Sequence, residues 1–379
     1  MDILGYVRSN KSSFEELPFN HLDALAFTWL TYFDIPEVVG KVPLEFSRWP
    51  ENPLFSKIET FHRSFVPKTS ANLVRLMVAS PRYKDARLID FAYVSDRKAA
   101  LQFGAIAFEV AGKVLIAFEG TDLTYAGWRE DCEMAYSDTI ASYPRALSFL
   151  KRVSSKTTGP IVLSGHSKGG NVATYCLAVA EDDSRIEAVY SYEGPGFHTK
   201  DIFAQHSERS VKLFKYVPHN AVVGILLNDE SNLRIVKTYT VGILQHNALR
   251  WVIKNNDFVY LKKRSMTSHF IDRSVNSWIE SLSEKDKRRF SKLFFEYLEA
   301  FGPDEFDELY KKFFFHVPAL FRAYGNLSDD DRTFFNGVIK KLGAHFVATI
   351  KENRRLRLEK KAKPAPKSKK PKTAEISKK

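Results

Sequence analysis

The segment from residue 160 to residue 180, PIVLSGHSKGGNVATYCLAVA, constrains the fold of this chain more than any other. Its apolar run Ile161–Leu163 predicts a short buried strand, and the alanine-rich stretch Asn171–Ala180 predicts a helix. The seven residues SGHSKGG between them leave room only for a sharp turn. A strand, a Gly-x-Ser-x-Gly turn and a helix in this order are typical of a nucleophile elbow.

Ser167 lies at the centre of this turn and is the candidate nucleophile. A serine hydroxyl reacts only when it is exposed beside a base and close to oxyanion donors, and an elbow presents it in this way. Gly165 and Gly169 flank it, where a Cβ would crowd the turn or block close packing of strand and helix. The backbone N–H of Lys168 is one candidate oxyanion donor. The motif also arises by chance in loops, but the flanking strand and helix favour the elbow.

A second oxyanion donor is expected from a loop that follows an earlier strand. Alternating apolar residues predict a hairpin of residues 101–110 against 113–118, and a Gly-Thr-Asp sequence follows its second strand. Thr121 in that sequence offers an N–H and a hydroxyl, so it is the second candidate donor; the alternative is an ordinary turn. Trp128, a few residues later, lies either in a lid over the site or in the core.

The strands after the elbow complete the predicted fold. They cover residues 186–192, 211–217 and 234–240. Strand patterns alternate with helical patterns, which predicts a mostly parallel sheet with flanking helices, the α/β-hydrolase arrangement.

His246 follows the last of these strands and is the candidate general base, because the chain order in α/β hydrolases is Ser, acid, His. The alternative is a structural histidine beside Trp251. No Asp or Glu occurs in residues 216–228, where the orienting acid is expected. Asn220 is the nearest polar candidate, since an Asn can orient an imidazole, and Asp229 is an alternative that would have to fold back.

The chain divides into three predicted parts. Residues 1–264 form the hydrolase domain with an N-terminal helical and loop segment, in which Asn20 is expected to cap a helix. Residues 265–350 carry apolar residues at helical spacing and predict a helical region. Residues 351–379 carry 13 Lys and Arg against three Glu, which is ten of the twelve net positive charges of the chain. Their low apolar content predicts a disordered tail.

The composition of the chain also bears on its binding partners, its location and its need for a cofactor. The basic tail predicts weak electrostatic contact with an anionic membrane or nucleic acid, with a solvated extension as the alternative. It contains no aromatic residue, so specific nucleic-acid binding is not expected. Two cysteines give no disulfide framework, and the chain shows no transmembrane run or signal-peptide core, so a cytoplasmic location is expected. No cofactor and no metal are expected.

Several motifs in a fixed order resemble a bacterial family of lipase-like α/β hydrolases, the Mbeg-like domain of unknown function, which is related to class 3 lipases. The motifs are FEGTD at 118–122, GWRED at 127–131, GHSKGG at 165–170, EGPGF at 193–197 and LQHNALRW at 244–251. The resemblance implies that Thr121 carries an oxyanion donor and that the segment around Trp128 forms a lid. Two positions depart from class 3 lipases: Glu119 replaces their usual Arg, and their acid position falls on Ala221.

These observations predict a serine hydrolase of acyl esters, in which His246 activates Ser167. The substrate is expected to be a small-molecule or lipid ester. A second hypothesis, motivated by the missing carboxylate, is an α/β-hydrolase fold that serves as a non-catalytic binding or regulatory module. A carboxylate beside His246 would discriminate between them.

Overall fold

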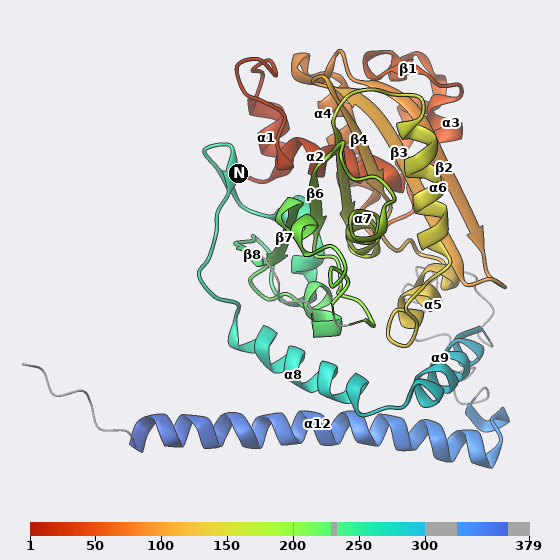
Figure 1. Ribbon diagram of the computed structural model, residues 1–379, viewed down its shortest axis with the longest axis vertical. Helices are drawn as coiled ribbons and strands as arrows, with labels where there is room; N and C mark the ends of the chain where they lie inside the picture. The colour runs from red at the N-terminus through yellow and green to blue at the C-terminus, as the bar shows by residue number, and fades with distance from the viewer. Residues whose placement is uncertain (200, 229–232, 300–323, 363–379) are drawn as a thin grey trace, which may run out of the picture.

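An eight-stranded sheet forms the centre of the molecule in the computed structural model, which describes residues 1–199, 201–228, 233–299 and 324–362 (Figure 1). The strands lie side by side in sequence order. β1 to β4 pair antiparallel and β4 to β8 pair parallel, so the predicted mostly parallel sheet is confirmed. The strands are β1 (Leu44–Glu45), β2 (Arg87–Asp96), β3 (Leu101–Val110), β4 (Lys113–Phe118), β5 (Ile161–His166), β6 (Ile186–Tyr192), β7 (Leu213–Pro218) and β8 (Leu233–Val236).

Several strands differ from the sequence prediction, whereas the hairpin of β3 and β4 has the predicted bounds. β1 was not predicted, and β7 begins and ends later than the predicted residues 211–217. β2, which pairs with β3 along nearly its whole length, was not predicted because its mixed, half-exposed sequence lacks a clear apolar pattern. β8 ends at Val236 and does not reach residue 240. The N–H of Thr240 bonds the hydroxyl of Thr238 at 2.8 Å, so the chain turns there.

Helices cover both faces of the sheet. α6 (Ser142–Ser154) and α7 (Lys168–Val179) pack on one face, and α1 (Ile3–Ser9), α2 (His21–Thr28) and α4 (Pro67–Val78) lie on the other. Successive side chains of a strand point to opposite faces of the sheet, so each strand contributes to both helical layers. On β3, Ile106 and Phe108 point into the N-terminal layer, while Ala105 and Ala107 point toward α6 and α7.

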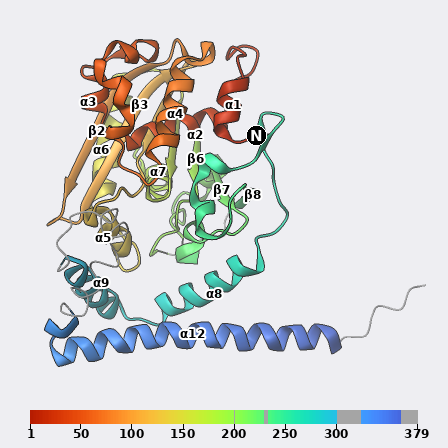
Figure 2. The same cartoon turned by 180° about the vertical axis from the view of Figure 1, so that it is seen from behind.

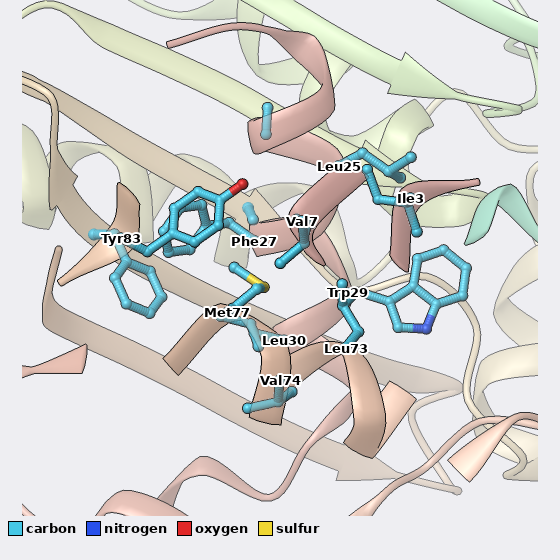
Figure 3. Close-up of a cluster of buried hydrophobic side chains, with 14 of the residues drawn as sticks. Ile3, Val7, Leu25, Phe27, Trp29, Leu30, Leu73, Val74, Met77 and Tyr83 are labelled. Carbon is cyan, nitrogen blue, oxygen red and sulfur yellow. The ribbon is translucent and has the colours of Figure 1, made fainter. Parts of the chain in front are cut away.

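The N-terminal layer is an apolar core in its own right. Figure 3 shows Leu25 and Phe27 of α2 among Val74 and Met77 of α4 and Val7 of α1, all of them buried. The predicted N-cap is present as a full capping box, in which the side chain of Asn20 accepts from the start of α2 and Asp23 closes the box. This layer fixes the short 3₁₀ helix η1 (Trp29–Tyr32) against the sheet.

The C-terminal helices cover the edge of the sheet at which the parallel strands end. α8 (Met266–Glu280) runs beside α12 (Asp329–Ala362), and α9 (Glu284–Glu299) lies against α5 (Tyr125–Glu133), as Figures 1 and 2 show. Asn276 of α8 donates to the carbonyl of Ile225, in the loop after β7, at 2.8 Å. Besides short 3₁₀ helices, the described chain also contains the short helix α3 (Ile35–Val39) and a ribbon of β9 (Ile253–Lys254) and β10 (Asp257–Phe258).

The helices after the sheet begin with α8 at Met266, and the last of them extends past residue 350, where the helical region was predicted to end. α12 continues through residue 351, where the tail was predicted to begin, to Ala362. Strong helix formers such as Lys, Arg, Leu and Glu fill residues 351–362, so charge alone did not mark the end of the helix. The rest of the predicted tail, residues 363–379, lies outside the described residues. Within the described ranges, no helix is both long enough and apolar enough to cross a bilayer.

Candidate active site

The predicted strand, sharp turn and helix around Ser167 are present. Ser167 sits between β5 and α7 with φ 57° and ψ −129°, a left-handed backbone conformation that non-glycine residues adopt only under constraint. Its N–H donates to the carbonyl of Tyr192 at 2.9 Å, and its carbonyl accepts from the N–H of Gly170 at 2.9 Å. Both bonds hold the strained turn at the carboxyl end of β5.

The two flanking glycines are required by close backbone contacts. A Cβ on Gly165 would lie 2.0 Å from the carbonyl oxygen of Gly169, and a Cβ on Gly169 would lie 2.2 Å from that of Phe118. Both distances are far below van der Waals contact. The glycines therefore allow α7 to approach β5 and β4, as the sequence predicted.

His246 is held by a carboxylate that sequence reasoning did not assign. Its Nδ1 lies 2.8 Å from Oε2 of Glu193, whose side chain is 1% exposed. Oε1 of Glu193 accepts from the N–H of Val222 at 3.0 Å, and the N–H of Glu193 donates to the carbonyl of Tyr216 at 2.8 Å. Glu193 itself has a positive φ of 53°. This arrangement fixes the carboxylate and aims one of its oxygens at the imidazole.

Asn220 does not occupy the place predicted for it. Its backbone N–H donates to Oε1 of Gln245 at 2.8 Å, so it supports the loop before His246 and does not orient the imidazole. The alternative, Asp229, lies outside the described residues. Ala221, where the acid of class 3 lipases was expected to fall, is a buried apolar residue packed with Val217 and Ile225. The chain thus carries its carboxylate one strand earlier.

A signal for Glu193 was present in the sequence. It directly follows β6, and parallel strands end at the same edge of the sheet, so residues after β6 and β5 come close together. The acid was expected only after β7, its usual position in the α/β-hydrolase fold. Glu193 instead follows an earlier strand after the elbow.

The elbow also contacts His246 directly. Nε2 of His166, the residue before Ser167, lies 2.8 Å from the backbone carbonyl oxygen of His246, and the two imidazole rings are 4.6 Å apart between centroids. The alternative was a structural His246 hydrogen-bonded beside Trp251. The indole of Trp251 instead donates to the carbonyl of Gln245 at 2.8 Å. Trp251 shapes the loop, whereas His246 faces Glu193.

The predicted oxyanion residues meet at the same place. A Cβ on Gly120 would lie 3.2 Å from Cβ of Ser167, so the loop that carries Thr121 passes close to the nucleophile. The hydroxyl of Thr121 donates to Oδ2 of Asp131 at 2.7 Å, which leaves its N–H as the candidate donor. Burial is the largest cause that raises the pKa of Asp131, to about 6. Lys168 contributes the first N–H of α7.

A family model described as Mbeg1-like matches residues 77–296, which is more than half of the chain. The chain belongs to the Mbeg1-like family. Among solved structures, a mutant form of MDLA from Penicillium cyclopium is 12% identical, with a TM-score of 0.36, over 62% of this chain and 83% of its own. Lip2 lipase from Yarrowia lipolytica is 13% identical, with a TM-score of 0.32, over 56% of this chain and 77% of its own. No curated protein matches.

The side chain of Lys168 gives this member of the Mbeg1-like family a buried polar centre beneath the elbow. Its Nζ donates to Oε2 of Glu130 at 2.7 Å and to the carbonyl of Gln102 at 2.6 Å. Glu130 also accepts from the N–H of Ser142 at 2.7 Å and from that of Gln102 at 3.2 Å. One carboxylate therefore ties α5 to the starts of α6, α7 and β3.

Glu119, which departs from the Arg of class 3 lipases, is paired with an arginine from elsewhere in the chain. Nε of Arg63 lies 3.1 Å from Oε1 of Glu119, and its guanidinium also donates to the carbonyls of Thr31 and Phe33. Burial is the largest cause that raises the pKa of Glu119, to about 7. This pair joins the end of β4 to the N-terminal segment.

Trp128 lies in the contact between α5 and the C-terminal helices. Tyr125 of α5 packs with Phe295 and Leu298 of α9, and Trp128 packs against the same cluster. The segment predicted as a lid or as core is therefore covered by α9. In the described parts of the chain, no group of three or more His, Cys, Asp or Glu residues is placed to hold a metal ion.

Proposed function

We propose that this protein is a serine hydrolase that acts on carboxylic acyl esters. The observation that carries the proposal is the pairing of His246 with the buried carboxylate of Glu193, at the same edge of the sheet as the strained elbow of Ser167. A serine, a histidine and an acid arranged on strand ends form the nucleophilic machinery of α/β hydrolases. The chain order is Ser167, Glu193, His246.

The first step is activation of the nucleophile. An ionised carboxylate only accepts hydrogen bonds, so Glu193 holds the His246 tautomer with its proton on Nδ1. Nε2 then carries the lone pair that takes the proton of the Ser167 hydroxyl as its oxygen attacks the ester carbonyl. The same proton passes to the leaving alcohol. His246 then takes a proton from water as the water attacks the acyl group, and it returns this proton to Ser167 as the acid is released.

The second requirement is stabilisation of the tetrahedral oxyanion. We assign this to the N–H groups of Lys168 and Thr121, because the turn at the start of α7 and the loop after β4 meet at Ser167. Asp131 accepts a hydrogen bond from the hydroxyl of Thr121 and so fixes the loop. Loss of one such donor costs about 10²–10³ in rate in serine hydrolases.

The alternative function is a non-catalytic binding or regulatory module. It rested on the lack of a carboxylate near His246, and the 2.8 Å contact with Glu193 removes that motive.

Both cysteines, Cys132 and Cys176, are free thiols, which fits the proposed cytoplasmic location. Weak electrostatic contact of the Lys-rich tail with an anionic membrane or nucleic acid stays a proposal.

Labelling of the purified protein with a fluorophosphonate probe tests the proposed function. We expect labelling of the wild type and loss of labelling in Ser167→Ala and His246→Ala. Asn220→Ala is the matched control, because it lies in the loop beside His246 but contributes only its backbone N–H. A labelled wild type is then assayed on esters of increasing acyl length. A folded wild type that is not labelled would favour the binding module.

A further inference from the structure

We propose that Tyr32 and His166 are positioning residues that hold the general base, so that the N-terminal segment completes the active site. The proposal rests on the proposed function, because it assigns a role relative to His246 as base. Tyr32 ends η1 and lies outside residues 77–296, which the family model matches. It therefore adds to the site from a part of the chain that the family model does not match.

The contact geometry defines a chain of hydrogen bonds. The hydroxyl of Tyr32 lies 2.9 Å from Nδ1 of His166, and Nε2 of His166 lies 2.8 Å from the backbone carbonyl oxygen of His246. Tyr32 is 3% exposed and His166 is 5% exposed. In this series of hydrogen bonds, Tyr32 comes from the N-terminal layer, His166 from the elbow and His246 from the loop after β8.

The direction of these bonds follows from the chemistry of the atoms. A carbonyl oxygen only accepts, so Nε2 of His166 must carry a proton. Burial is the largest cause that lowers the pKa of His166, which keeps the imidazole neutral, and Nδ1 is then an acceptor. Tyr32 must therefore be the donor to Nδ1. The carbonyl of His246 thus fixes the tautomer of His166, and the hydroxyl of Tyr32 supplies the hydrogen bond that the buried Nδ1 of this tautomer needs.

The consequence is that His246 is held at two points. Glu193 holds its ring through Nδ1, and His166 holds its backbone carbonyl. With the other tautomer, the lone pair of Nε2 of His166 would face the carbonyl oxygen and repel it. The loop would then shift, and a displacement of about 1 Å at a reacting group can cost about 10²-fold in rate.

The surroundings of Tyr32 leave it little freedom. A Cβ on Gly120 would lie 2.2 Å from Oη of Tyr32, so the hydroxyl also packs against the oxyanion loop. The Trp29 ring lies 4.8 Å from the His166 ring between centroids, and its indole donates to Ser70 of α4 at 2.9 Å. The hydroxyl of Thr28 is hydrogen-bonded to that of Ser164 on β5. The N-terminal layer thus fixes Tyr32 against the elbow.

Tyr32→Phe tests the proposal, since it removes the hydroxyl and keeps the ring. We expect the rate of fluorophosphonate labelling and kcat on an ester to fall about threefold to tenfold, the worth of one hydrogen bond, with KM unchanged. Tyr143→Phe is the matched control, because it removes an equally buried hydroxyl that bonds Asn171 at 2.8 Å and does not contact His246. Equal rates in Tyr32→Phe, Tyr143→Phe and the wild type would overturn the proposal.

A second pair of variants tests His166 itself. His166→Gln keeps an N–H donor at the end of a side chain of similar length, whereas His166→Leu removes it. We expect a larger loss of kcat in the Leu variant, of about 10²-fold, and partial recovery in the Gln variant. Equal losses in both would contradict a positioning role.

A third readout does not depend on activity. NMR of ¹⁵N-histidine-labelled protein reports which nitrogen of His166 is protonated. We expect Nε2 protonated in the wild type, in Ser167→Ala and in Tyr32→Phe, and a shift of the Nδ1 resonance in Tyr32→Phe, where Nδ1 loses its hydrogen-bond donor. A proton on Nδ1 in the wild type would overturn the tautomer assignment, even if probe labelling supports the proposed function. An unlabelled wild type with the expected tautomer would instead refute only the catalytic role.

Discussion

Nδ1 of His246 lies 2.8 Å from Oε2 of Glu193, although 53 residues separate them in the sequence. The contact joins the end of β6 to the loop after β8, two places that the parallel sheet brings to one edge. It replaces the predicted partner, Asn220, with a carboxylate that can stabilise the imidazolium formed during catalysis.

Removal of the Glu193 charge is expected to lower kcat strongly. Glu193→Gln keeps the size of the side chain but presents an amide that can donate to Nδ1 and select the wrong tautomer of His246. In a serine protease the equivalent change costs about 10⁴-fold, and we expect a loss of about 10³–10⁴-fold here. Steady-state kinetics on an activated ester measures it. Activity of Glu193→Gln equal to that of Asn220→Ala would show that the acid lies elsewhere.

Substitution of the elbow glycine Gly169 is expected to lower the stability of the fold strongly. Gly169→Ala places a Cβ 2.2 Å from the carbonyl oxygen of Phe118, so α7 must move away from β4. Overpacking of this kind costs about 1–3 kcal/mol or more. Gly337→Ala, in α12, meets nothing within 4 Å and is expected to raise stability by up to about 1 kcal/mol. Thermal unfolding compares them, and equal shifts in Tm would contradict the close contact at the elbow.

The buried ion pair of Lys168 and Glu130 predicts that substitutions at these two residues have non-additive effects on the free energy of unfolding. Lys168→Met leaves Glu130 without its cation in a site where both side chains are 1% exposed or less, which costs about 3–5 kcal/mol. Glu130→Gln alone leaves the ammonium group unbalanced. The double variant removes both charges and should lose less free energy of unfolding than the sum of the two single variants. Additive losses in urea unfolding would argue against the ion pair.

Asp131 predicts a change of stability with pH. Its pKa in the folded protein is raised to about 6 by burial, whereas an unfolded Asp titrates near about 4. A raised pKa means that the contribution of this group to stability is complete below about pH 4 and is lost as the pH rises through about 6. Relative to Asp131→Asn, the wild type should therefore lose stability between these values and change little above them. Urea unfolding at several pH values measures the difference, and a constant difference across this range would refute the assignment.

Local patterns in the sequence identified the elements that depend on neighbours along the chain. The apolar run before Ser167, the glycines beside it and the alanine-rich stretch after it predicted β5, the turn and α7, because steric and hydrogen-bonding demands there act within a few residues. The hairpin of β3 and β4 and the cap at Asn20 were predicted for the same reason.

The sequence alone therefore predicted the nucleophile elbow, the mostly parallel sheet and the residues at the strand ends. Which of those residues meet depends on the tertiary structure. Glu193 pairs with His246, Arg63 with Glu119, and Tyr32 with His166. Each pair joins residues more than fifty positions apart, and their contact depends on how the strands are ordered and on how the N-terminal layer packs. Such contacts are set by the burial of the whole core, which no local pattern encodes.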